Sequence, residues 1–146
     1  MVDLLKYKII LPLFTTFYHF VNKLLFFSLL SLRKLTNLGQ YEISYAISCH
    51  YSKWGNKCST NLDKYLLACD EITGFIVACS KVRPNGVSDL KSKSVLKSLK
   101  KKSFAASVDR NEIYHGVDLI GVDLNEHIDF IINVLKENAK ILELKR

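Results

Sequence analysis

Apolar positions recur at steps of three and four residues over most of the chain from residue 41 onward, which places them on one face of an α-helix. The clearest case is the C-terminal stretch, whose apolar side consists of Leu124, Ile128, Ile131, Leu135 and Leu142. No stretch has the alternation of a β-hairpin or the strand–helix–strand order of a βαβ unit. The pattern therefore predicts an all-α fold, a bundle of helices.

A long apolar helix is predicted to begin near Asn61 and to end before Pro84. Thr60 and Asp63 have the spacing of an N-terminal capping pair, and a proline cannot continue a helix. A shorter helix is expected in residues 41–51, and the residues on its apolar face would be Ile43, Ala46, Ile47 and His50.

Three further helices are predicted after Pro84. The first is rich in lysine, runs from about Leu90 to Lys101, is capped by Ser88 or Asp89, and is followed by a break in the small residues SFAAS. Two capping pairs mark the starts of the others, with a glycine between them that suits a helix C-terminus; these residues are Asp109 with Glu112, Asp123 with Glu126, and Gly121.

The N-terminal residues 1–40 form a hydrophobic segment that differs from the helical region 41–146. Within it, residues 9–32 are long and apolar enough to cross a bilayer, but His19, Asn22 and Lys23 lie near the centre, where a charge costs roughly 2.5–3.5 kcal/mol. Three interpretations are open: a membrane anchor, a pair of core helices, or a segment foreign to the domain that follows.

Composition and charge favour a folded domain with a basic region. The 146 residues are 49% apolar, which argues against general disorder, and the formal net charge is +7. Residues 81–102 hold eight lysines or arginines against one acidic residue. The expected basic helix is amphipathic, with solvated lysines, and it could alternatively attract a phosphate-bearing partner.

The four cysteines form no CxxC pair, and the first residues do not end in a secretory cleavage site. Reduced, buried cysteines in a cytoplasmic protein are therefore expected. A zinc site formed by Cys49, His50 and Cys58 is the alternative, although thiolate sites usually contain closely spaced pairs. The other histidines, His115 and His127, are expected at the surface or at the edge of a helix.

Two adjacent acids, Asp70 and Glu71, interrupt the long apolar helix. Helical spacing places both among apolar neighbours, and an ionised carboxylate in such surroundings needs a partner. The candidates are a metal ion, a basic side chain such as Arg83 or Lys81, and backbone N–H groups of a facing loop. Gly74 is expected to let another backbone or a ligand approach these acids.

Several motifs resemble one known family. The stretches AISCH (46–50), LLACDEITGFIVACSKVRP (66–84), KSKSVLKSLKKKSFAASVDRNEI (91–113) and the last amphipathic helix are similar to the C-terminal part of the HD-domain family, specifically the HDIG-type metal-dependent phosphohydrolases. The similarity covers about residues 41–146. It implies a helical fold of HD-domain type, with the N-terminal metal-binding helices missing or replaced in this chain.

The resemblance also implies an activity and a metal site. The family hydrolyses phosphate esters with a water molecule that is activated by a divalent metal ion. By motif match, Asp70 corresponds to the late aspartate ligand and His50 to a histidine that serves a second metal. The family's His-Asp doublet has no counterpart, because no His-Asp pair occurs in the sequence. The chain is therefore expected to be a truncated or degenerate member that is either inactive or completed by another chain.

Two alternatives from other functional classes stay open. One is a non-catalytic helical interaction protein in which a basic side chain holds Asp70; the other is a membrane-tethered protein in which residues 9–32 are inserted beside the basic helix. The expected ligand is a phosphorylated small molecule or a nucleotide. Nucleic acid is a poor candidate, because the lysine run contains no aromatic residue for base stacking and Phe104 alone directly follows it. The sequence favours no particular oligomeric state.

Overall fold

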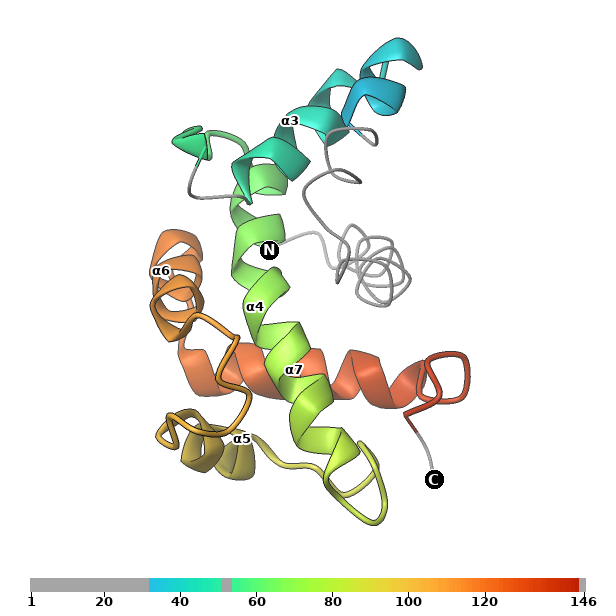
Figure 1. Cartoon of the computed structure of the whole chain (residues 1–146), viewed down its shortest axis with the longest axis vertical. Helices are drawn as coiled ribbons and strands as arrows, with labels where there is room; N and C mark the ends of the chain where they lie inside the picture. Colours follow the sequence, from blue (N-terminus) through green and yellow to red (C-terminus); the bar gives the residue numbers. More distant parts are fainter. Residues whose placement is uncertain (1–31, 51–53, 145–146) are drawn as a thin grey trace. The chain divides into compact units, whose positions relative to one another are not determined.

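The computed structural model describes residues 32–50 and 54–144, and within them the chain is helical with no strand, which confirms the predicted all-α class (Figure 1). The elements are a helical turn at residues 32–37, α3 (Tyr41–Cys49), α4 (Asn61–Lys81), α5 (Ser92–Leu99), α6 (Arg110–Ile120) and α7 (Leu124–Glu137).

The chain divides into two compact units, unit 1 (residues 1–67) and unit 2 (residues 68–146), and the boundary between them falls within α4. Residues 1–31, which contain nearly all of the candidate membrane span 9–32, lie outside the described residues. Among the residues that are described, no helix is both long and apolar enough to cross a bilayer.

In unit 1, hydroxyl contacts join α3 to the preceding helical turn. The hydroxyls of Thr36 and Ser44 are 3.1 Å apart, and Ser44 also donates to the carbonyl of Leu32. Because its hydroxyl is satisfied there, Ser44 takes a buried place on α3 beside Ala46, whereas Ile43 is 43% exposed. The prediction that Ile43 lies on the buried face of this helix was therefore wrong, and the neighbouring Ser44 is buried in its place.

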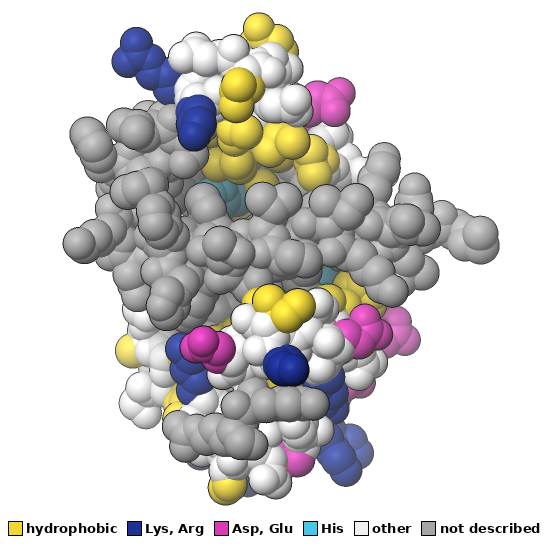
Figure 2. Space-filling model, turned by 90° about the vertical axis from the view of Figure 1, so that its right-hand side faces the viewer, with side chains coloured by type: hydrophobic (Ala, Val, Ile, Leu, Met, Phe, Trp, Pro, Cys, Tyr) yellow, Lys and Arg dark blue, Asp and Glu magenta, His cyan; other side chains and the backbone are white. Residues whose placement is uncertain are grey.

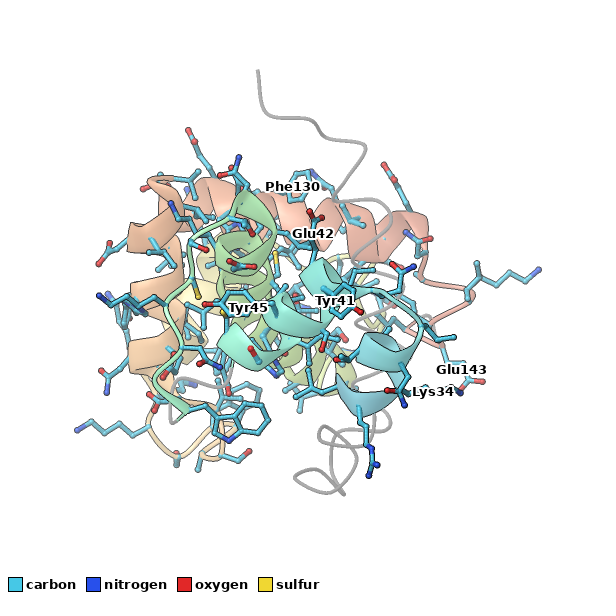
Figure 3. All side chains as sticks on the ribbon, turned by 90° about the horizontal axis from the view of Figure 1, so that it is seen from above. Lys34, Tyr41, Glu42, Tyr45, Phe130 and Glu143 are labelled. Atoms are coloured by element: carbon cyan, nitrogen blue, oxygen red, sulfur yellow. The ribbon has the colours of Figure 1, made fainter. Side chains whose placement is uncertain are left out.

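Large apolar side chains remain exposed on unit 1, and Figure 2 shows several hydrophobic groups together on one face of it. Tyr41 and Tyr45 lie one turn apart on α3 (Figure 3). With Leu38 and Ile43 they are the exposed large hydrophobic residues described in this unit.

The predicted cap at the start of α4 is confirmed. The Thr60 hydroxyl accepts the N–H of Asp63 at 3.2 Å, and the Asp63 carboxylate accepts the N–H groups of Thr60 at 2.8 Å and Ser59 at 3.0 Å. Desolvation alone would raise the pKa of Asp63, but these donors outweigh it and lower that pKa. The carboxylate therefore stays ionised where it ties the loop to α4.

In unit 2, α7 crosses the C-terminal part of α4 and contacts α5 and α6 (Figure 1). Its apolar side is buried as predicted at Ile128, Ile131 and Leu135. The helix ends at Glu137, so Leu142 lies beyond it and packs against the core from a turn. The other large members of this core include Ile72, Phe75, Ile76, Val87, Leu90, Val95, Leu99, Ile113 and Leu144.

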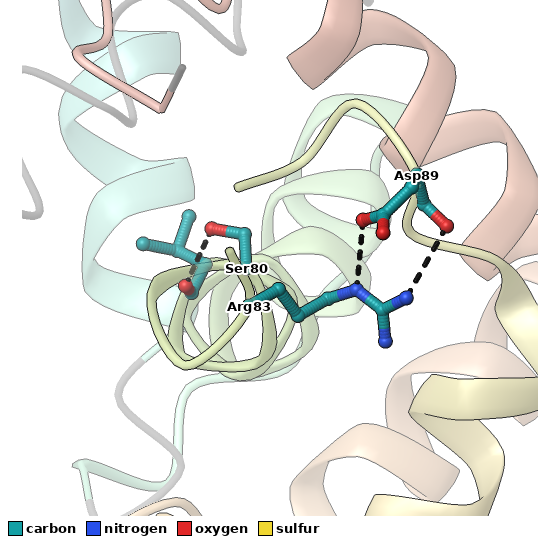
Figure 4. Close-up of polar contacts among 4 residues, drawn as sticks. Ser80, Arg83 and Asp89 are labelled. Atoms are coloured by element: carbon teal, nitrogen blue, oxygen red, sulfur yellow. Dashed lines mark hydrogen bonds and ion pairs between the residues drawn. The ribbon is translucent and has the colours of Figure 1, made fainter. Parts of the chain in front are cut away.

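The start of α5 differs from the prediction. The helix begins at Ser92, and Lys91 occupies the N-cap position without a side-chain hydrogen bond. Asp89 is unavailable as a cap because its carboxylate accepts from Arg83 Nε at 2.9 Å, within the turn that follows α4 (Figure 4). The expected caps at Ser88 or Asp89 were therefore wrong.

The predicted starts of α6 and α7 and the predicted end of α6 are confirmed. Asp109 accepts the N–H of Asn111 at 2.9 Å, and Asp123 accepts those of Asn125 and Glu126 at 2.9 and 3.1 Å. Gly121 ends α6 in the left-handed conformation with a φ of 67°. The short turn between the two helices therefore follows from local sequence alone.

Candidate functional site

The two acids of the apolar helix lie side by side on the part of α4 that belongs to unit 2. Asp70 and Glu71 are both partly buried, and residues one and two turns further on, such as Thr73 and Val77, are buried. The predicted apolar surroundings of these carboxylates are thus present, although neither group is cut off from solvent.

Glu71 is held by a backbone donor, one of the three predicted kinds of partner. Its carboxylate accepts the N–H of Asp109 at 3.2 Å, across 38 positions of sequence. Asp109 is the N-cap of α6, so this bond fastens the start of α6 to α4.

This bond changes the capping arrangement predicted at α6. In a complete capping box, Glu112 would accept the N–H of Asp109, but Glu71 takes that donor. The Glu112 Oε2 atom is buried and has no hydrogen-bond partner within the described part of the chain. The reciprocal half of the Asp109–Glu112 pair was therefore predicted wrongly, because a residue distant in sequence competes for it.

The surroundings of Glu71 are strongly acidic. Its pKa is raised from 4.5 to about 7, first by burial and then by the negative charge of Asp70, with smaller contributions from Asp109 and Glu112. The N–H of Asp109 acts in the opposite direction and lowers it. Negative potential therefore accumulates around α4 where Asp70 and Glu71 lie.

The raised pKa makes Glu71 a source of pH-dependent stability. An unfolded glutamate loses its proton near pH 4.5 and folded Glu71 near pH 7, so the folded state binds more protons between these values. The free energy of unfolding should therefore fall as the pH rises through this window. Glu71→Gln keeps an oxygen for the Asp109 N–H and should raise stability at pH 8 by about 1–2 kcal/mol, allowing for solvent screening.

Urea denaturation followed by circular dichroism at pH 5 and pH 8 measures this effect. The parent-minus-variant difference isolates Glu71 from His127, whose lowered pKa has the opposite sign and removes stability below about pH 6.5. Asp118→Asn, at an exposed position of α6, is the charge-matched control and should leave the pH dependence unchanged. Equal destabilisation of Glu71→Gln at both pH values would contradict the prediction.

The basic residues suggested as partners for the acids lie at the end of α4 and in the turn after it. Arg83 donates through Nε to Asp89 and through Nη2 to the carbonyl of the same residue, as Figure 4 shows. That hydrogen bond is the main reason why the pKa of Arg83 is raised. Lys81 is exposed at the last position of α4. Arg83 thus serves the turn between α4 and α5.

His50, the second predicted metal ligand, belongs to unit 1. It is the C-cap residue of α3, and its Nδ1 atom donates to the carbonyl of Ile47. Asp70 belongs to unit 2, so the two predicted ligands are described in separate units. Within residues 32–50 and 54–144, no three His, Cys, Asp or Glu side chains are grouped so that they could hold a metal ion.

The zinc alternative at Cys49, His50 and Cys58 gains no support from the thiols. The Cys49 thiol donates to the carbonyl of Lys57, and the Cys58 thiol to that of Cys49. Burial raises the pKa of Cys58 to about 11, with a further contribution from Cys49. Cys58 is therefore protonated at neutral pH. All four cysteines are free thiols, and Cys49, Cys69 and Cys79 are buried as predicted, whereas Cys58 is partly exposed.

His127 is the residue whose position sequence reasoning missed. It is 5% exposed rather than superficial, and its Nε2 atom lies 3.1 Å from the carbonyl of Ala68. Burial lowers its pKa, so the ring is neutral at pH 7. Its spacing from the buried residues Ile131 and Val134 is the signal that could have placed it in the core. His115, in contrast, is exposed as predicted.

The basic helix is amphipathic, as predicted. Val95 and Leu99 are buried on one side of α5. All six lysines of the run are exposed: Lys91, Lys93, Lys97, Lys100, Lys101 and Lys102.

Comparisons with protein families, with curated proteins and with solved structures find no match to this chain.

Proposed function

We propose that this chain is a cytoplasmic domain of the HD-domain, metal-dependent phosphohydrolase type whose metal centre is incomplete, and that Asp70 binds a divalent cation. The observation that supports the proposal is the acidic potential at α4. A carboxylate raises the pKa of a neighbouring acid when its own charge is close, and Asp70 does this to both Glu71 and Cys69. A divalent cation would neutralise this repulsion.

The metal ligands available in this chain would form only part of a divalent metal centre. Carboxylate oxygens suit hard divalent ions such as Mg²⁺ or Mn²⁺. However, the described residues contain no group of three His, Cys, Asp or Glu ligands, and the sequence lacks a His-Asp pair. We therefore assign metal binding to Asp70 and no hydrolytic step to this chain alone. The exposed lysines of α5 would attract a phosphorylated ligand.

Metal titration of the full chain tests the role of Asp70. In isothermal titration with Mn²⁺, we expect Asp70→Asn to bind at least about tenfold more weakly than the parent chain. Asparagine preserves the size of the side chain, so circular dichroism should show an unchanged helical content. Asp118→Asn removes one exposed acidic charge from the same unit and should bind Mn²⁺ as the parent does. His50→Ala, titrated in the same way, tests the predicted second ligand.

Two results would contradict the proposal: no Mn²⁺ binding by the parent chain, or equal affinities for the parent and Asp70→Asn. Either result would favour the non-catalytic alternative, an interaction protein that uses the lysine face of α5. That alternative draws on one specific observation, the six exposed lysines in residues 91–102, a stretch that contains no acidic residue. The membrane-tethered alternative depends on residues 9–32, nearly all outside the described part of the chain.

A further inference from the structure

Two of the four cysteines lie in contact in unit 1. Cys49 is the last residue of α3, and Cys58 lies in the loop that leads into α4. The Cys49 thiol is 3.6 Å from the carbonyl of Lys57, and the Cys58 thiol is 3.8 Å from the carbonyl of Cys49. Cys49 is also among the groups that raise the pKa of Cys58, which agrees with the proximity of the two thiols.

We propose that Cys49 and Cys58 form a reversible disulfide that fastens the loop before α4 to the end of α3. The contact is local in sequence, since the two residues are nine positions apart. Asp63 and Thr60 cap α4 just beyond this loop, so the loop is already held on the side of Cys58. The thiols already lie beside the same stretch of backbone, and the disulfide requires the two sulfur atoms to approach to about 2.05 Å.

The hydrogen bonds that oxidation removes are weak or are replaced. Both thiols donate to backbone carbonyls, and sulfur is a weak donor. The carbonyl of Lys57 also accepts the hydroxyl of Tyr45 at 3.2 Å, so it keeps a partner when Cys49 loses its proton. Tyr45 reaches the loop from α3, where Figure 3 labels it. The surrounding polar groups thus tolerate either redox state.

The reaction requires an oxidant, and a low-molecular-weight disulfide such as oxidised glutathione supplies it. One protein thiolate attacks the glutathione disulfide and forms a mixed disulfide with release of one glutathione thiolate. The second protein thiolate then attacks the mixed disulfide and releases the other. The protein loses two electrons and two protons, and one oxidised glutathione becomes two reduced molecules.

The four thiols of the chain differ in access. Cys58 is partly exposed, whereas Cys49 and, in unit 2, Cys69 and Cys79 are buried. Burial raises the pKa of Cys69 to about 12, and it also raises that of Cys79. The pKa of about 11 at Cys58 makes exchange slow at pH 7, and Lys64 is the neighbouring charge that favours its thiolate. Oxidation should therefore be selective for the Cys49–Cys58 pair and faster at mildly alkaline pH.

Equilibration of the native full chain with oxidised and reduced glutathione at pH 8.5, followed by acid quenching, alkylation and peptide mapping, tests the proposal. We expect a mass loss of about two hydrogens and a single linked peptide pair that contains Cys49 and Cys58. Cys58→Ser should abolish the linkage, while Cys79→Ser, at a buried position of unit 2, should leave it unchanged.

Recovery of Cys49 and Cys58 as free thiols or only as glutathione adducts would overturn the inference, and so would a linkage to Cys69 or Cys79. Circular dichroism of each variant establishes that it is folded. If Cys58→Ser fails to fold, the parent chain still decides the matter, because the linked peptides are identified without any variant. None of these outcomes depends on whether Asp70 binds a metal ion.

Discussion

Replacement of Gly116 by leucine is expected to destabilise unit 2 by about 3 kcal/mol or more. A Cβ atom at this position of α6 would lie 2.6 Å from the Cα of Ala68 and 3.2 Å from its backbone nitrogen. Both neighbours belong to the backbone of α4, which cannot rotate out of the way as a flexible side chain would. The two helices would have to separate and lose the packing around Ile113.

Urea denaturation followed by circular dichroism measures this loss. Gly116→Ala provides a sharper test of direction, because alanine in an unobstructed helix interior stabilises by about 1 kcal/mol relative to glycine. Here it should destabilise. His115→Leu introduces the same leucine at the adjacent, exposed position of α6 and should change stability by less than about 0.5 kcal/mol. A stabilising Gly116→Ala would show that α4 and α6 do not approach closely.

The close contact at Gly116 was not among the features predicted from the sequence. The sequence drew attention to Gly74, on α4 itself, as the place where another backbone could approach the acids. A close approach involves Gly116 of α6, which contacts α4 at Ala68. A sequence pattern identifies a glycine that is costly to a helix, but it does not say which distant segment takes advantage of the missing side chain.

Local sequence predicted most of the helix boundaries. Thr60 with Asp63, the N-caps Asp109 and Asp123, and Gly121 form bonds within a few residues of themselves, so their roles depend little on the rest of the fold. Two missed caps have a common cause, which is a competing hydrogen bond. The Asp89 carboxylate accepts from Arg83, and the N–H of Asp109 is taken by Glu71, 38 positions away in sequence.

The candidate site could be predicted only in part for the same reason. The apolar surroundings of Asp70 and Glu71 follow from helical spacing, and they are present. The partner of Glu71 is a backbone N–H 38 positions away, which no periodicity reveals. His127 reaches the carbonyl of Ala68 across 59 positions, although it was expected at the surface or at the edge of a helix. The sequence therefore did not predict which polar groups of different helices bond to each other.

Phe75→Ala is expected to cost about 4 kcal/mol, the largest loss that we predict for a single truncation. Phe75 is fully buried in the core of unit 2, and its ring meets that of Phe104 edge to face with centroids 5.5 Å apart. The Arg110 guanidinium lies 5.2 Å from the centre of the same ring. Truncation therefore leaves a cavity and removes a support for Arg110 at once.

Arg110 gives this truncation a second, local consequence. Its Nη1 atom donates to the carbonyls of Ala105 at 2.8 Å and Val108 at 2.6 Å, and its Nη2 atom donates to that of Phe104. These bonds hold the turns between α5 and α6. Without the ring of Phe75, hydrogen exchange in residues 101–108 should accelerate more than exchange in α7.

Urea denaturation gives the overall cost, and hydrogen exchange with mass spectrometry gives its distribution along the chain. Phe75→Leu refills part of the volume but offers no aromatic face, so it should recover most of the stability while exchange in residues 101–108 stays fast. Equal protection of these turns in Phe75→Leu and the parent chain would mean that the aromatic face contributes nothing to holding Arg110. Because Arg110 is the first residue of α6, that result would leave the Asp109 N-cap, with its hydrogen bond to Glu71, as the principal anchor of the helix start.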